Sequence, residues 1–240
     1  MDTLPVDERA EIASDGYLDN VVWASLSGAH SPRAQAYGGA LRYRPEFAPF
    51  GAARDYSESS VAQIAAMLRP GERLSLFTIA APEIPQGYDT VIEATLVQMI
   101  ASRPLAPSAD GRIVPLANED AADMLRLAEI AQPGPFNTRT HELGNFIGIR
   151  EQGRLVAMAG ERMVAGKYVE ISAVCTHPDR RGVGYGRLLM EHLTASIQQR
   201  GQAPLLHVFP TNEGAIKLYR ALGYRTARKL RLTVLALAPL

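Results

Sequence analysis

Three glycines at alternate positions are the clearest chemical signal in this sequence of 240 residues. Gly182, Gly184 and Gly186 lie in the segment VCTHPDRRGVGYGR, between a predicted strand and a predicted helix. Glycines let a ligand approach the backbone closely, and the first N–H groups of a helix have no partner within it. Three arginines lie in the same segment: Arg180, Arg181 and Arg187. The turn is therefore predicted to bind an anion, with a diphosphate as the natural guest.

The spacing of these glycines separates three classes of phosphate-binding loop. A mononucleotide P-loop ends in Gly-Lys-Ser/Thr, but here Gly186 is followed by arginine and leucine. A dinucleotide-binding loop needs Gly-x-Gly-x-x-Gly and an acid about 20 residues later. Residue 187 is arginine, and no acid lies between residues 191 and 213. The remaining pattern, Arg-x-x-Gly-x-Gly, is met by Arg181, Gly184 and Gly186.

A second block, NEGAIKLYRALGY, occupies residues 212–224 and follows the pattern Asn-x-x-Ala-x-x-Leu-Tyr-x-x-x-Gly-aromatic. With the glycine turn in the same order and spacing, it resembles the GCN5-related N-acetyltransferase (GNAT) family, and within it the FR47-like group. The resemblance covers residues 112–240. It implies an acyl-CoA N-acyltransferase fold and acetyl-CoA as cosubstrate, with no metal. It also implies direct attack by a primary amine of a small molecule or a peptide N-terminus, within a ternary complex.

The resemblance assigns the cosubstrate to two segments. The strand end Val174, Cys175 and Thr176 would pair through its backbone with the pantetheine arm, and the strand at 205–209 would diverge from it to leave a slot. The pyrophosphate would lie on the turn, which consists of Arg181, Gly182, Val183, Gly184, Tyr185, Gly186 and Arg187. Asn212 would either contact the pantetheine arm or cap its own helix.

Acyl transfer to an amine requires that the amine lose a proton and that the departing thiolate gain one. Tyr219, in the second block, is the predicted general acid, because a phenol with a pKa of about 10 can protonate a thiolate. The alternative is a core aromatic, since Tyr219 also lies on the apolar face of its helix. Glu170 is the predicted base, directly or through water, because an ideal strand places it on the same face as Val174. Glu161 is the competing candidate.

Two further residues near the predicted cleft have simpler interpretations than catalysis. Cys175 is better explained as a small buried hydrophobe than as a nucleophile. His207 could assist proton transfer or could be a hydrogen-bonded residue of its strand. The histidines form no metal-binding pattern.

The spacing of apolar residues and of turn residues along 112–240 predicts the helices and strands that position the candidate site residues. Strands are expected at 112–116, 145–150, 155–163, 168–176, 205–209 and 230–237, and helices at 118–130, 182–200 and 212–222. The fold class is therefore α+β, with a mixed, mostly antiparallel sheet flanked by helices.

The first part of the chain is less legible. Residues 102–112 (SRPLAPSADGR) have the texture of a linker and predict a boundary between domains at 1–110 and 111–240. Strands are expected at 21–25, 74–80 and 89–94, and a helix at 60–68. This texture suggests a second, degenerate copy of the same fold, without a phosphate-binding turn.

Composition excludes several classes of function. Lys and Arg total 25, as do Asp and Glu, and this neutral balance argues against nucleic acid or an anionic membrane as a partner. One cysteine and an acidic beginning without a secretory pattern predict a cytoplasmic protein. The sequence leaves a homodimer open. The alternative function, from another class, is a non-catalytic module that senses acyl-CoA.

Overall fold

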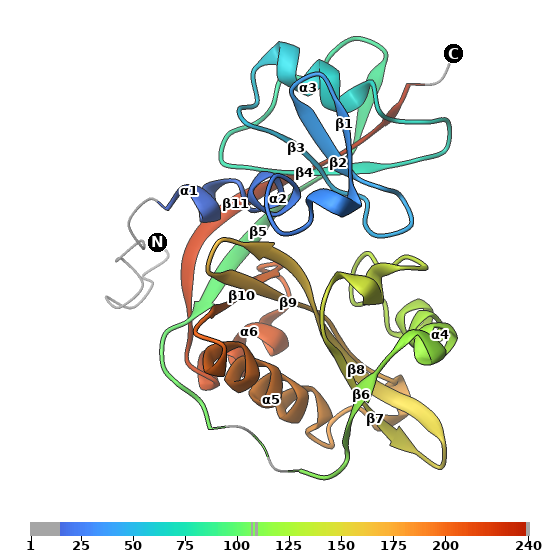
Figure 1. Ribbon diagram of the computed structural model, residues 1–240, viewed down its shortest axis with the longest axis vertical. Helices are drawn as coiled ribbons and strands as arrows, with labels where there is room; N and C mark the ends of the chain where they lie inside the picture. The colour runs from blue at the N-terminus through green and yellow to red at the C-terminus, as the bar shows by residue number, and fades with distance from the viewer. Residues whose placement is uncertain (1–14, 107, 109, 239–240) are drawn as a thin grey trace.

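The computed structural model describes residues 15–106, 108 and 110–238, which form a sheet of eight strands and a smaller sheet of three (Figure 1). The large sheet has the order β4-β11-β5-β10-β9-β8-β7-β6. Its strands are β4 (Leu74–Thr78), β5 (Tyr88–Ala101), β6 (Ile113–Leu116), β7 (Phe146–Glu151), β8 (Arg154–Ala165), β9 (Tyr168–Thr176), β10 (Ala203–Val208) and β11 (Tyr224–Leu237). All neighbours in this sheet are antiparallel except β9 and β10. The predicted α+β class is confirmed.

Three helices flank the C-terminal part of the sheet: α4 (Ala121–Ala131), α5 (Tyr185–Gln199) and α6 (Glu213–Ala221). Apolar residues of α5 and α6 pack on one face, whereas Met124 and Leu127 of α4 pack with Cys175 on the other. The main difference from the sequence prediction is the start of α5, which lies at Tyr185 rather than residue 182. Gly182 and Gly184 have φ angles of 82° and 90°, which no right-handed helix accommodates. No helix in the described ranges is long and apolar enough to cross a lipid bilayer.

The large sheet is continuous across the predicted boundary at 110/111. β5 lies between β10 and β11 and pairs antiparallel with both. β4 pairs with β11, the last strand of the chain. In Figure 1, β5 and β11 extend from one half of the molecule into the other. Each half therefore completes the other's part of the sheet, and the division into two domains stays a prediction.

The N-terminal half repeats the order of elements of the C-terminal half. The three-stranded antiparallel sheet of β1 (Ala34–Tyr37), β2 (Ala40–Tyr43) and β3 (Gly51–Ala53) precedes helix α3 (Glu58–Ala65). After α3, β4 returns parallel to this sheet through a bridge between Phe50 and Ser75. In the same way β7, β8 and β9 precede α5, and β10 returns parallel to β9. This repeated order is what the prediction of a degenerate second copy requires.

The strand predicted at 21–25 is wrong, because these residues form helix α2 (Val21–Leu26), which follows the short helix α1 (Gly16–Asp19). The side chain of Asn20 accepts a hydrogen bond from the Trp23 N–H and begins α2. Val21, Val22 and Leu26 are buried in a cluster that includes residues of β8. Tertiary packing thus outweighs the strand preference of the valine pair.

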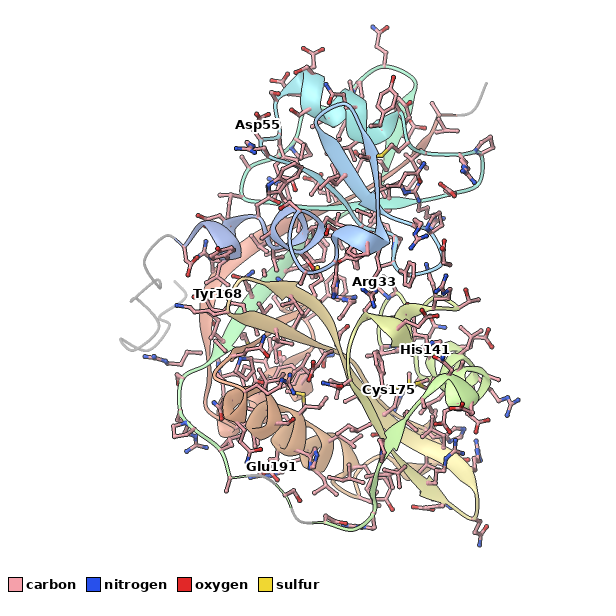
Figure 2. All side chains as sticks on the ribbon, viewed as in Figure 1. Arg33, Asp55, His141, Tyr168, Cys175 and Glu191 are labelled. Atoms are coloured by element: carbon pink, nitrogen blue, oxygen red, sulfur yellow. The ribbon has the colours of Figure 1, made fainter. Side chains whose placement is uncertain are left out.

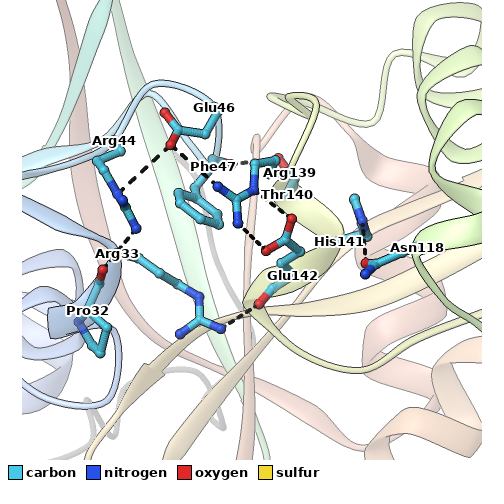
Figure 3. A network of polar contacts seen from close by, with 10 residues as sticks. All are labelled: Pro32, Arg33, Arg44, Glu46, Phe47, Asn118, Arg139, Thr140, His141 and Glu142. Carbon is cyan, nitrogen blue, oxygen red and sulfur yellow. Dashed lines mark hydrogen bonds and ion pairs between the residues drawn. The ribbon is translucent and has the colours of Figure 1, made fainter.

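A polar and aromatic contact joins the two halves beside α4 (Figure 3). The backbone N–H of Arg139 donates to the Glu46 carbonyl, and the Thr140 hydroxyl donates to the Phe47 carbonyl at 2.6 Å. The guanidinium of Arg139 also lies 4.6 Å from the centre of the Phe47 ring. Residues 46–47 are thereby fixed to the short η4 helix (Thr140–Leu143) of the C-terminal half.

We expect that residues 111–240 cannot fold alone. Without β5, the facing edges of β10 and β11 would be unpaired, and long exposed strand edges favour aggregation. The fragment should show no cooperative thermal transition by circular dichroism, whereas co-expression with residues 1–110 should restore one. A cooperative transition in the isolated fragment would contradict this dependence.

Candidate active site

A cleft of about 1050 Å³ opens where β9 and β10 separate. Their parallel pairing ends at Glu170 and Leu205, and residues 171–176 of β9 and 207–209 after that point line the cleft. The predicted divergence of these strands is therefore confirmed. Gly182, Gly184 and Gly186 line the same cleft.

A bulge in β9 shapes one wall of the cleft. The register with β8 shifts between Met158 and Gly160, and Ala173 has a φ of 54°. The extra residue turns Val174 toward the face that carries Val169. The expectation that Glu170 and Val174 share a face is consequently wrong, because it assumed an ideal strand.

The glycine turn has the geometry that an anion site requires. Gly182 and Gly184 adopt left-handed conformations, and a Cβ built on either meets nothing within 4 Å. The first N–H groups of α5 follow directly, and the dipole of this 15-residue helix adds positive potential there. A ligand phosphate can thus approach the backbone without meeting a side chain at these positions.

The three arginines near the turn differ in availability. Arg180 pairs with Glu151 at 2.6 Å, and Arg187 pairs with Glu191 at 2.8 Å along α5. The side chain of Arg181 has no carboxylate partner within the part of the chain that the structure describes. Exposed pairs such as Arg187–Glu191 contribute less than about 1 kcal/mol, so a phosphate can compete for that guanidinium.

Tyr219 lies on α6 and lines the cleft, with 9% of its surface exposed. Its hydroxyl makes no hydrogen bond to any of the described residues. Burial raises the pKa of the phenol to about 12, so the group keeps its proton at neutral pH. Tyr219 is therefore a residue of the cleft lining whose O–H donor has no protein partner among the described residues.

Glu170 lies in a buried cluster with Arg162 and His207. Its carboxylate accepts hydrogen bonds from Arg162 Nε and Nη2 at 2.8 and 2.7 Å, and His207 Nδ1 lies 2.8 Å from Oε1. Burial by itself would raise the pKa of this carboxyl, but the charge and hydrogen bonds of Arg162, with those of His207, outweigh it and lower the pKa to about 2. A carboxylate held in this way is a weak proton acceptor.

Comparison with known proteins identifies the family. Residues 146–232 match the family model described as FR47-like protein. A crystal structure of a GNAT-family protein from Novosphingobium aromaticivorans DSM 12444 is 36% identical, with a TM-score of 0.88 over 94% of this chain and 100% of that one. This chain belongs to the GNAT family.

Two other relatives support the assignment less strongly, because one is similar in fold alone and the other matches only part of this chain. A GCN5-related N-acetyltransferase from Kribbella flavida shares the fold, with a TM-score of 0.62 and 19% identity over 91% of this chain and 95% of that one. The ribosomal protein bS18-alanine N-acetyltransferase of Escherichia coli strain K12 is 34% identical over 80 residues, which are 33% of this chain and 53% of that protein. This GNAT chain thus spans about half the length of the curated relatives it matches.

The other predicted cosubstrate residues of this GNAT protein fall into two groups. Thr176 and Asn212 line the cleft, and Asn212 also caps α6 by accepting a hydrogen bond from the Ala215 N–H at 3.2 Å. Tyr185 lines the cleft as well, with its hydroxyl directed to Glu151. Val183 does not line the cleft, and its side chain is 57% exposed.

Burial of Cys175 and an ion pair of Glu161 make both residues unsuited to catalysis. Figure 2 shows Tyr168 beside the N-terminal half, at the start of β9, and Cys175 farther along the strand. Burial raises the pKa of the Cys175 thiol to about 12, which disfavours a thiolate nucleophile. Glu161 pairs with Arg200 at 2.7 Å and does not line the cleft, so the geometry gives it no access to an acceptor amine.

Sequence reasoning missed Arg162, Phe50 and Phe77, which all line the cleft. An arginine inside the apolar run of β8 was a usable signal, because a buried charge demands a partner. No local signal marked Phe50 or Phe77, since they reach the cleft only through the pairing of β4 with β11.

The Glu170 ion pair should appear in the pH dependence of stability. Its folded pKa lies below the ordinary 4.5, so the stabilisation is present above pH 4.5 and is lost as the pH falls toward 2. Glu170→Gln leaves the buried Arg162 unpaired, and we expect a loss of about 3 kcal/mol at neutral pH. Denaturant titration between pH 2 and pH 7 should show a flatter profile for the variant.

Glu191→Gln is the matched control, since it removes a carboxylate from an exposed pair and should cost less than about 1 kcal/mol. Equal pH profiles for wild type and Glu170→Gln would contradict the assignment of a stabilising ion pair.

Proposed function

We propose that this GNAT protein is an acetyl-CoA-dependent N-acetyltransferase that acts on a primary amine. One observation carries the proposal: a single cleft contains both the open glycine turn before α5 and the free hydroxyl of Tyr219. The first suits a pyrophosphate and the second a departing thiolate. Among relatives, the Escherichia coli protein is named for acetylation of an alanine in ribosomal protein bS18, which supports an amine acceptor.

Acetyl-CoA, when bound, supplies the activated acetyl group as a thioester. The α5 N-terminus and Arg181 hold the pyrophosphate, and the separated strands β9 and β10 hold the pantetheine arm between them. The bulge at residues 173–174 leaves backbone groups of β9 outside the regular ladder. We infer that a backbone N–H from Val174 or Cys175 holds the thioester oxygen as it gains charge.

Tyr219 then donates its proton to the sulfur as the C–S bond breaks. A phenol with a raised pKa remains protonated until the thiolate forms, so the proton is available when charge develops. A free hydroxyl in this position favours catalysis over a non-catalytic acyl-CoA sensor, which has no use for a proton donor.

Glu170 takes a positioning role in this proposal rather than the role of base. Two bonds from Arg162 and one from His207 keep its carboxylate ionised and occupied. The proton of the attacking amine therefore passes to solvent in the cleft. Glu170 orients Arg162 and His207, both of which line the cleft.

The buried single cysteine fits a reducing compartment, and we propose a cytoplasmic location.

Binding of acetyl-CoA can be tested by calorimetry with Gly186→Ala. The new Cβ lies 4.0 Å from Thr176 Oγ1 and meets no other protein atom nearby, so it occupies the space proposed for the cosubstrate. We expect the Kd to rise at least about tenfold. Stability should not fall, because alanine has a higher helix propensity than glycine.

The matched control is Gly111→Ala, which lies outside the cleft and also adds a Cβ in open space. Its Kd should equal that of the wild type. Failure of the wild-type protein to bind acetyl-CoA at micromolar concentration would overturn the proposed function.

Tyr219→Phe should separate catalysis from binding. Loss of the proton donor should lower kcat by about 10²- to 10⁴-fold and leave the acetyl-CoA Kd unchanged. Thiol release with an amine panel measures kcat. Tyr224→Phe is the control: its hydroxyl bonds Thr194 at 2.8 Å outside the cleft, so stability falls by about 1 kcal/mol and turnover persists. A Tyr219→Phe variant with normal kcat would make Tyr219 a packing residue.

A further inference from the structure

The end of the cleft opposite the glycine turn is built largely by the N-terminal half. Phe50, Ser75, Phe77 and Leu96 line it, together with Arg162 of β8. Glu170, to which Arg162 is bonded, lies six residues before Thr176 on β9, which corresponds to roughly 20 Å along an extended strand. Since the cosubstrate enters over the glycine turn in the proposed function, this far end is where an acceptor must lie.

Arg162 has one nitrogen to spare at this end. Nε and Nη2 bond Glu170, whereas Nη1 has no hydrogen-bond partner among the residues that the structure describes. The residue is 7% exposed, and its surface faces the cleft. The Phe50 ring packs against the guanidinium, with its centre 4.7 Å from Cζ. A rigid, nearly buried N–H donor of this kind suits a carboxylate oxygen.

The charge of the lining points the same way. None of the described residues that line the cleft is an aspartate or a glutamate. Glu170 itself is 1% exposed and already bonded to Arg162 and His207. A second positive charge on the acceptor would find no counter-ion here, and an unpaired charge in a poorly hydrated site is costly.

The remaining wall is apolar. The rings of Phe50 and Phe77 lie 5.2 Å apart in an edge-to-face arrangement, and Phe77 also packs on His207 at 5.1 Å. Leu96 and Leu232 extend this surface. Such a wall gains free energy by covering an apolar side chain.

We propose that the acceptor is a free α-amino acid with an apolar or aromatic side chain, its carboxylate bound by Arg162 Nη1 and its side chain against Phe50 and Phe77. This inference rests on the proposed function and narrows its acceptor. The amine nitrogen forms a bond to the acetyl carbon, and the C–S bond breaks. The amine gives one proton to solvent and the sulfur takes one from Tyr219, which solvent restores. The products are an N-acetyl amino acid and CoA.

Acetyl-CoA-dependent thiol release tests this with acceptors that differ in one group. L-phenylalanine is compared with L-phenylalanine amide, phenethylamine, the dipeptide Phe-Ala and spermidine. We expect kcat/KM for phenylalanine to exceed that of each other amine at least about tenfold, because none of the others has a carboxylate on the carbon that bears the amine, so the ion pair with Arg162 is lost. Equal or faster release with the amide, the dipeptide or spermidine, or no release with phenylalanine, would overturn the proposal.

Two variants locate the effect. Arg162→Lys keeps the charge beside Glu170 but lacks the third nitrogen, and it should bring phenylalanine and its amide to within about threefold of each other. If Arg162→Lys fails to fold, Phe50→Leu provides a second test. This variant is expected to raise the KM for phenylalanine more than the KM for alanine. An unchanged preference in the folded variants would contradict the assignment.

Calorimetry with acetyl-CoA distinguishes a wrong acceptor class from a wrong cosubstrate. Binding together with thiol release to spermidine or Phe-Ala but not to phenylalanine would leave the proposed function intact and overturn the acceptor class. Absence of acetyl-CoA binding would overturn the proposed function itself.

Discussion

The hydrogen bonds between β9 and β10 end at Glu170 and Leu205, and the rest of the site depends on that separation. If these parallel strands continued to pair, their backbone N–H and C=O groups would bond one another and none would be available to a ligand. Here the bulge at Ala173 bends β9 away, and the released backbone becomes one wall of the cleft. The glycine turn and the start of α5 follow only a few residues later, so one local irregularity brings the backbone wall and the anion site together.

The opening remains stable because the strands beyond it are braced by the other half of the chain. β5 pairs with β10 on the side away from β9, and β11 closes the sheet beyond β5. The pairing of β4 with β11 brings β4 and its neighbour Phe50 to the cleft. The N-terminal half, which was predicted to have no phosphate-binding turn, thus supplies the wall that an acceptor would meet. If the N-terminal half is a degenerate copy of the fold, as predicted, it has kept the order of its elements while its residues line the cleft of the other half.

Sequence reasoning reached the C-terminal elements because each is marked locally. Glycines end α5 and α6, and apolar residues at helical spacing define their buried faces. The glycine turn followed from its spacing, whereas residues 174–176 and Tyr219 were assigned to the cleft by the resemblance to the GNAT family. The helix at 21–26 was not predictable in this way, because its valines favour a strand and only contact with β8 decides the outcome. The insertion of β5 between β10 and β11 was equally hidden, since strand pairing across more than 100 residues leaves no local pattern.

For Glu170, the sequence predicted the correct strand but not the residues that surround the carboxylate. The sequence placed it on the strand that leads to the turn, and its position there suggested a base. The structure surrounds it with Arg162 and His207, and the pairing changes the chemistry from proton abstraction to the orientation of a cation. A buried ion pair is a poor source of net stability, because desolvation cancels much of its attraction, and apolar residues of similar volume often serve as well.

The ion pair is better explained by the group that it leaves available: Glu170 uses two nitrogens of Arg162, and the third is left at the surface of the cleft. Because Phe50 packs over the same guanidinium, the N-terminal half fixes the direction in which that nitrogen points. The acceptor end of the site is thus a property of both halves together, and neither half contains it alone.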